Sequence, residues 1–216
     1  TTFAAYCGTN DCIGVANGTD ALELALRALN CGPGDLVATV ANAGMYATVA
    51  ILAVGARPLF VDIDADNMTM SAAALRSVMS PAVKVVIATH LYGQLVDMAA
   101  LAEAAGDAAL VEDCAQAHGA MRGGVRAGAF GAIGCFSFYP TKNLGAMGDG
   151  GALTTNDLDL SATLRALRMY GWSERFVAEL AGGRNSRLDE IQAAVLSAKL
   201  PYLEAWNARR REIAAL

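Results

Sequence analysis

Short runs of apolar, often β-branched residues alternate along most of the chain with segments whose apolar residues recur at helical spacing. The predicted strands are 12–16, 36–40, 58–61, 84–89, 109–112, 132–138 and 150–154. The predicted helices are 20–29, 46–54, 72–79, 98–105 and 158–169. Each strand is nearly continuous in apolar residues, which indicates burial on both faces. This alternation predicts an α/β fold with a mostly parallel sheet flanked by helices.

The remaining pattern concerns the two ends of the chain. Residues 187–216 read as one or two long helices that are interrupted at Pro201, because proline disrupts a helix interior. The chain begins at Thr1, without a methionine, in a run with helical character, and it stops inside a polar helical run. We therefore expect a piece of a longer protein.

Composition restricts the class of protein. The 216 residues are 55% hydrophobic and 17% charged, with a net charge of -5, which predicts a soluble globular protein with one large core. A chain without basic excess is not expected to bind nucleic acid. The apolar runs are short and broken by charged residues or glycine, so neither a membrane span nor a signal peptide is expected.

Cysteine and histidine usage argues against disulfides and metal. The five cysteines are irregularly spaced, lack a Cys-x-x-Cys pair and read as buried free thiols of a cytoplasmic protein. They are Cys7, Cys12, Cys31, Cys114 and Cys135. With only His90 and His118 available, a zinc site would need scattered ligands, and no metal is expected.

A single lysine stands out near the end of one predicted strand. Lys142 lies between an apolar run and a glycine-rich turn, where a solvent-seeking ammonium has no ordinary structural role. Burial lowers the basicity of an amine, and a neutral amine can attack a carbonyl to form a Schiff base. The alternative is an ordinary loop lysine on the surface.

Two other strand ends carry polar residues, and ligands of open α/β sheets bind at such ends. Gly18 and Thr19 open a helix whose free N–H groups suit a phosphate, although the segment from Asn17 also suits a simple N-cap. Asp113 could hold a protonated ring nitrogen or act as a helix cap. A pyridoxal phosphate site requires hydrogen-bond donors for the phosphate, an acidic partner for the ring nitrogen and an amine nucleophile.

Several segments, in collinear order, closely resemble the DegT/DnrJ/EryC1/StrS family of sugar aminotransferases. They are residues 17–22, 32–35, 55–58, 61–64, 112–120, 137–145 and 185–188. The resemblance implies pyridoxal 5'-phosphate as cofactor and the large domain of the fold type I transferases. It further implies a cofactor-binding domain over residues 1–200. Residues 201–216 would begin a helical connection to a C-terminal domain that this chain lacks.

The resemblance also assigns roles to individual residues. Lys142 would bind the cofactor covalently, and Asp113 would pair with the pyridinium nitrogen. Gln116 would lie against the cofactor ring or its 3-oxygen. The phosphate would be bound by the remaining matching residues, Thr19, the Gly18 backbone and Ser137.

One further role and one departure concern residues at the margins of the site. Asn185 would reach the partner's phosphate across a homodimer, or else be a turn or cap residue before a helix that begins near Arg187. Many family members carry an aromatic residue that stacks on the cofactor where this chain has Gly44 and Met45. Tyr46 is the substitute we expect, although it could also be a core residue.

The implied activity is transfer of an amino group from an amino acid, glutamate by family habit, to a nucleotide-linked keto-sugar. The run 39–44 resembles the branch that acts on dTDP-linked keto-deoxysugars. Two other classes stay open: a homologue or fragment that binds the cofactor without turnover, and a phosphate-binding or nucleotide-binding module without chemistry. The intact Lys142 argues against the second.

Overall fold

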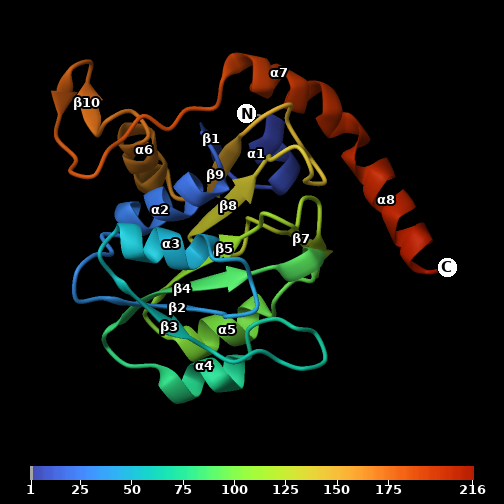
Figure 1. Cartoon of the computed structure of the whole chain (residues 1–216), viewed down its shortest axis with the longest axis horizontal. Coiled ribbons are helices and arrows are strands. Elements are labelled where there is room, and N and C mark those ends of the chain that lie inside the picture. The colour runs from blue at the N-terminus through green and yellow to red at the C-terminus, as the bar shows by residue number, and fades with distance from the viewer. Residues whose placement is uncertain (1) are drawn as a thin grey trace.

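The computed structural model describes residues 2–216 (Figure 1). Its α-helices are α1 (Thr2–Cys7), α2 (Gly18–Ala28), α3 (Tyr46–Ala53), α4 (Ala72–Val78), α5 (Met98–Ala105), α6 (Leu158–Leu167), α7 (Glu190–Lys199) and α8 (Leu203–Ala214). Two 3₁₀ turns are η1 (Leu91–Gly93) and η2 (Leu200–Tyr202). The strands are β1 (Asp11–Val15), β2 (Leu36–Thr39), β3 (Arg57–Phe60), β4 (Val83–Thr89), β5 (Ala109–Asp113), β6 (Met121–Arg122), β7 (Val125–Arg126), β8 (Ile133–Ser137), β9 (Gly151–Thr155), β10 (Trp172–Glu174) and β11 (Val177–Ala178).

The central feature is a seven-stranded sheet in the order β1-β9-β8-β5-β4-β2-β3. The strands from β3 to β8 in this order pair in parallel. Only β9 runs against its neighbours β1 and β8. The prediction of a mostly parallel α/β sheet is confirmed, and each predicted strand overlaps one strand of this sheet.

Helices cover both faces of the sheet (Figure 1). Side chains alternate along each strand, so Val85 and Ile87 of β4 join one core with α2, α3 and α6, while Val86 and Ala88 join a second core with α4 and α5. A third core gathers α1, α7 and the end of β8 around Phe136. Burying one large apolar side chain fully contributes about 1.5–3 kcal/mol to the stability of the fold. Because helices cover both faces of the sheet, both sets of alternating side chains are buried, which accounts for the continuous apolar runs.

One predicted strand is less buried than expected. Residues 58–61 were predicted to be buried on both faces, but β3 is the edge strand of the sheet and none of its residues is buried. Pro58 lacks the N–H that an inner strand would need, and Phe60 is 52% exposed. The N-terminal run with helical character forms α1, whereas the sequence pattern missed two short hairpins, β6–β7 and β10–β11.

The C-terminal helices form an arm along one side of the body (Figure 1). As predicted, the helical segment is interrupted around Pro201, where η2 joins α7 to α8. Leu200 and Leu203, on either side of Pro201, are buried in the third core. The arm is therefore packed on the body at this junction.

The cysteines agree with the sequence pattern except at one position. No disulfide links the five, all of which lie in the described part of the chain. Cys7, Cys31, Cys114 and Cys135 are buried as predicted, whereas Cys12 on β1 is only partly buried. Burial raises the pKa of the Cys114 and Cys135 thiols well above its usual range. Across residues 2–216, none of the helices combines the length and the apolar character needed to cross a membrane.

Candidate functional site

The N-terminus of α2 presents free donors at the edge of the sheet. The Asn17 side chain accepts from the Asp20 N–H at 2.8 Å, and the first helical bond runs from the Ala21 N–H to the Asn17 carbonyl at 3.1 Å. Asn17 is therefore the N-cap, as one of the two interpretations predicted. The N–H groups of Gly18 and Thr19 precede the first helical bond and have no partner within the helix, so they can bind an anion.

Gly18 allows the helix to approach the end of β8 closely. A Cβ at position 18 would lie 2.7 Å from the Cβ of Ser137, which is too short for any real contact. The absent side chain lets the Ser137 hydroxyl lie beside the first turn of α2, next to Thr19. Two hydroxyls and a helix N-terminus thus meet at one place.

Asp113 is the last residue of β5 and supplies a nearly buried carboxylate, 8% exposed. One oxygen accepts from the Ala115 N–H at 3.1 Å, and the other has no hydrogen-bond donor among residues 2–216. Burial raises the pKa of Asp113, and the Ala115 N–H and the positive charge of Lys142 only partly oppose this effect. No helix follows β5 directly, so the helix-cap interpretation of Asp113 is wrong.

Lys142 follows β8 and is the one lysine whose amine is unengaged, all three lysines being in the described part of the chain. The amine of Lys84 donates to the Asn30 carbonyl and lies 3.6 Å from an Asp35 oxygen. The amine of Lys199 donates to the Gly145 carbonyl at 2.7 Å. The expectation of a fully desolvated amine needs correction, since Lys142 is only half-buried. It borders more than one cavity.

These strand ends meet in a cavity of about 600 Å³, a size typical of sites for small molecules. Its lining includes the following predicted residues: Gly18, Thr19, Tyr46, Asp113, Ser137 and Lys142. Sequence reasoning did not single out Tyr139 and Asp149, which also line it, since each stands in a loop without a distinctive pattern. Tyr46 is 62% exposed, so it is not a core residue.

Two of the predicted residues lie elsewhere. Gln116 borders a neighbouring cavity, and its side-chain oxygen accepts from the Tyr92 N–H at 2.7 Å. Asn185 is exposed, and its side-chain oxygen accepts from the Arg187 guanidinium at 2.9 Å. The following helix begins at Glu190, three residues later than the sequence suggested.

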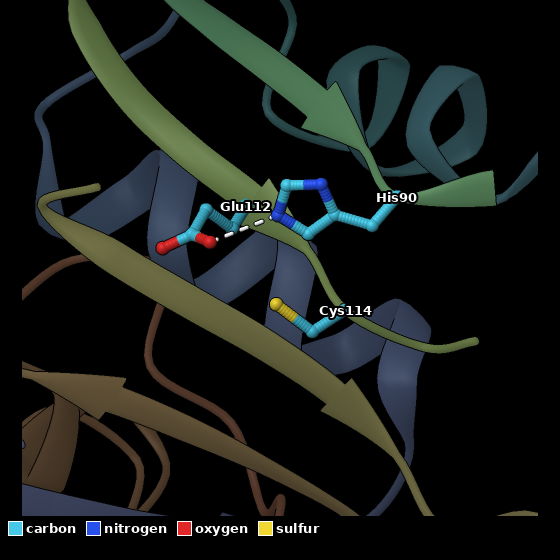
Figure 2. A group of neighbouring side chains, drawn as sticks. All are labelled: His90, Glu112 and Cys114. Atoms are coloured by element: carbon cyan, nitrogen blue, oxygen red, sulfur yellow. Dashed lines mark hydrogen bonds and ion pairs between the residues drawn. The ribbon is translucent and has the colours of Figure 1, made fainter. Parts of the chain in front are cut away.

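A buried cluster lies directly behind Asp113, on the opposite side of β5. Figure 2 shows the His90 ring and the Glu112 carboxylate pointing toward each other, with the Cys114 sulfur nearby. Their possible ligand atoms all lie within 4.8 Å of one another. His90 Nε2 lies 2.9 Å from Glu112 Oε2, and Nδ1 accepts from the Val96 N–H at 3.2 Å. The second bond places the ring proton on Nε2, facing Glu112.

The Glu112 carboxylate accepts hydrogen bonds from one side chain and three backbone N–H groups. Besides His90, it accepts from the N–H groups of Gly128 at 3.0 Å and of Phe130 and Gly131 at 2.8 Å each. Burial alone would raise the pKa of Glu112, but these hydrogen bonds outweigh it and hold the pKa below its usual range. Both ring nitrogens and both carboxylate oxygens are thus engaged, which is the chemistry of a structural cluster and not of a metal site.

The loop after Lys142 is held by α7 and α8. The Asn143 side chain donates to Asn207 Oδ1 of α8 at 2.8 Å, and Lys199 of α7 binds the Gly145 carbonyl. The Met147 N–H donates to Gln192 of α7 at 2.8 Å. Every second residue of the loop from 143 to 147 is therefore bound by a residue of the arm, and the arm residues follow one another in the reverse order, 207, 199 and 192. We call these three bonds the lysine-loop clamp. No pattern in the sequence predicted it.

Comparison with known proteins places this geometry among aminotransferases. The model of the DegT/DnrJ/EryC1/StrS aminotransferase family matches residues 1–216. A dTDP-3-amino-3,4,6-trideoxy-alpha-D-glucose transaminase of Micromonospora megalomicea subsp. nigra is 47% identical over 99% of this chain and 58% of its own length. A UDP-N-acetyl-3-dehydro-alpha-D-glucosamine 3-aminotransferase of Acidithiobacillus ferrooxidans is 46% identical over 98% of this chain and 58% of its own length.

The solved structures agree with the sequence relatives. The crystal structure of S. venezuelae DesV in complex with a ketimine intermediate has a TM-score of 0.95 and 45% identity, covering 99% of this chain and 58% of that chain. The described chain therefore spans less than two thirds of the length of the proteins it matches. The likeness confirms the fold type that the sequence predicted.

The Glu112 hydrogen bonds should contribute strongly to stability. We expect Glu112→Gln to lower the free energy of unfolding by about 2–4 kcal/mol, because an amide NH₂ would face N–H donors in a buried site. Urea unfolding at neutral pH measures the change. Since the pKa of Glu112 is lowered in the folded state, its contribution is present above the unfolded pKa and is lost as the pH falls below it.

The control for this variant is Glu103→Gln, which affects an exposed ion pair with Arg76 at 3.3 Å. Its effect should stay below about 0.5 kcal/mol. Equal free energies of unfolding for the two variants would contradict the role given to Glu112. So would a loss of stability at acid pH in Glu112→Gln that equals the loss in the wild type.

The lysine-loop clamp should restrict the motion of the loop. In Gln192→Ala the Met147 amide loses its acceptor, so its hydrogen exchange should speed up by about tenfold, the equivalent of one net hydrogen bond. Ser197→Ala, on the same helix, removes only a bond to the Ala193 carbonyl and should leave this amide unchanged. Unchanged exchange at Met147 in Gln192→Ala would show that the clamp does not restrain the loop.

Proposed function

The chain belongs to the DegT/DnrJ/EryC1/StrS aminotransferase family, and from this membership we propose that it transfers an amino group from an amino acid to a nucleotide-linked keto-sugar. Pyridoxal 5'-phosphate is the cofactor of the proposed reaction. The observation that carries the proposal is the unengaged Lys142 amine, which shares one cavity with Asp113 and the N-terminus of α2. A catalytically silent homologue is the alternative that experiment must exclude.

The residues of the cavity fit this cofactor. A phosphate matches the free N–H groups of Gly18 and Thr19 and the hydroxyls of Thr19 and Ser137. A protonated ring nitrogen matches Asp113, whose second oxygen has no donor among the described residues. Burial raises the pKa of Asp113, and a cation beside it would oppose that rise and favour the charged carboxylate.

Each residue then has a distinct role. Lys142 would hold the cofactor covalently through its aldehyde, and Tyr46 at the cavity edge would lie over the ring. When bound, pyridoxal phosphate supplies an electron sink for the carbanion that forms as the amino acid loses its α-proton. Asp113 keeps the ring nitrogen protonated. The Lys142 amine, freed by the incoming amino acid, would take the α-proton as a general base and give it to the cofactor carbon that had carried the aldehyde.

The substrates follow from the relatives. The relatives described above are named for dTDP-linked and UDP-linked amino sugars, so a nucleotide-linked keto-sugar is the acceptor that they share. We propose a dTDP-linked keto-deoxyhexose as the acceptor, in line with the run 39–44. We propose glutamate as the amino donor. Nucleotide sugars and buried reduced thiols are both consistent with a cytoplasmic reaction.

Attachment of the cofactor tests the central role of Lys142. Incubation with pyridoxal phosphate, borohydride reduction and peptide mapping should place the reduced cofactor on Lys142 and not on Lys84 or Lys199. Lys142→Ala should abolish the attachment and slow transamination by at least ~10²-fold to 10⁴-fold, the effect of a lost general base. Asp113→Asn should keep the attachment but lose activity. A label on another lysine, or attachment without any turnover, would overturn the aminotransferase proposal.

The domain boundary and the assembly complete the proposal. We propose that residues 1–200 form the cofactor-binding domain and that residues 201–216 begin a helical connection to a further domain. We also propose a homodimer in which Asn185 of one protomer reaches the phosphate of its partner. In support, Asn185 lies outside the cavity of its own chain, and α3 with its N-cap residue Met45 carries an exposed apolar face: Met45, Tyr46, Val49 and Leu52.

The homodimer can be tested at the apolar face of α3. Sedimentation should give twice the mass of one chain for the wild type. Val49→Lys combined with Leu52→Glu should dissociate the dimer, because the charges would enter an apolar interface. The matched control is Val78→Lys, since Val78 is 38% exposed on α4, across the sheet from α3. A wild-type monomer that binds the cofactor fully would contradict the role of Asn185.

A further inference from the structure

A second cavity of about 700 Å³ adjoins the proposed cofactor site and has no role in the account given so far. Thr141 and Lys142 lie in the wall of both cavities, so the two cavities meet at this segment. The second cavity lies between the body and α8, and Tyr92, Gln116 and His118 line the body side. Arg210 and Arg211 line it from α8.

The charge of this cavity is one-sided. Lys142, Arg210 and Arg211 all border it, and no described residue of its lining carries a carboxylate. Neither Arg210 nor Arg211 forms a salt bridge with any residue from 2 to 216, although the preceding Arg209 pairs with Glu212 at 3.0 Å. Arg211 is near enough to Glu204 to help lower the pKa of that carboxyl, but it forms no salt bridge with it. Guanidinium groups outside salt bridges are suited to bind an oxyanion, since their planar donors match a carboxylate or a phosphate.

His118 gives an independent indication of a ligand. Its ring is 2% exposed, and neither ring nitrogen has a hydrogen bond of standard geometry in the described chain, although the Ser137 backbone lies near one of them. Buried polar atoms without partners are rare in native proteins and point to a missing ligand or water. Burial lowers the pKa of His118 to about 3, so at neutral pH the ring is uncharged and can donate from only one nitrogen.

Tyr92 forms the rim of the same cavity under backbone strain. Its φ of 55° lies in the left-handed region, which is costly for an aromatic residue. The Gln116 side chain holds this conformation through the Tyr92 N–H, and the ring is 84% exposed. Strain of this kind gathers at binding sites, where it fixes the direction of a side chain.

We propose that this cavity is the subsite for a carboxylate group of the amino donor, bound by Arg210 and Arg211. The inference rests on the proposed function and deepens it. In an amino acid one carbon separates the reacting nitrogen from the α-carboxylate, so the carboxylate must bind close to Lys142, where the two cavities meet. The diphosphate of a nucleotide sugar is also an oxyanion, but it lies farther from the carbon that accepts nitrogen.

Binding of an unreactive dicarboxylate tests the proposal directly. Calorimetry with succinate should show binding to the cofactor-loaded wild type. The double variant Arg210→Gln, Arg211→Gln should weaken this binding by about tenfold to a hundredfold, as expected for the loss of charge-assisted hydrogen bonds. Arg209→Gln, one residue away on the same helix, should change it by less than about twofold.

Inorganic pyrophosphate provides the second arm of the experiment. Its affinity should change less in the double variant than that of succinate. If only pyrophosphate binding weakens, the cavity is a diphosphate subsite and the carboxylate proposal is wrong. The proposal is also wrong if succinate does not bind the wild type, or if Arg209→Gln weakens succinate binding as much as the double variant does.

Failure of the proposed function would look different from failure of this subsite. The arginine variants should keep the cofactor on Lys142, as borohydride mapping would show. If the wild type attached no cofactor, the aminotransferase proposal would fail, while arginine-dependent binding of succinate to that protein would still support the subsite. Normal attachment without arginine-dependent binding would overturn the subsite alone.

Discussion

The buried Glu112 carboxylate is the constraint around which the candidate site is organised. It accepts hydrogen bonds from the His90 ring and from three backbone N–H groups between β7 and β8. A buried charge without such partners would cost several kcal/mol, so the strand ends that supply them must keep their positions. Asp113 is the next residue and points to the other side of the sheet. Its place in the cavity is thus fixed by bonds that its own side chain does not make.

The sequence predicted the parts of the site that belong to strand ends. Apolar runs located the seven strands of the main sheet, and the rule that ligands bind at carboxyl ends singled out Thr19, Asp113 and Lys142. These predictions are possible because the spacing of apolar residues in a strand and the residues that begin a helix are set by neighbours in the sequence. The resemblance to a known family added the roles, and for the fold and the family the comparisons bear it out.

What the sequence could not predict depends on residues far apart in the chain. Burial of β3 was overestimated because its place at the sheet edge follows from the order of all strands and not from its own residues. Gln116 belongs to the segment that resembles the family, yet it borders the neighbouring cavity because it binds the Tyr92 backbone. The hydrogen bonds of Asn207 and Gln192 could not be predicted, because single contacts between a helix and a loop produce no repeating pattern in the sequence.

The lysine-loop clamp also sets an order of events during synthesis of the chain. The three bonds join residues that are 64, 54 and 45 positions apart, and in each case the partner on the arm is translated later. The parallel strands β2, β3, β4, β5 and β8 precede the loop, so they can pair on the ribosome before it emerges, whereas β9 follows the loop. The loop forms local backbone hydrogen bonds of its own, but the three bonds of the clamp cannot form until α7 and α8 have emerged. The loop that follows Lys142 is therefore clamped only after most of the sheet has formed, which separates formation of the scaffold from completion of the candidate site.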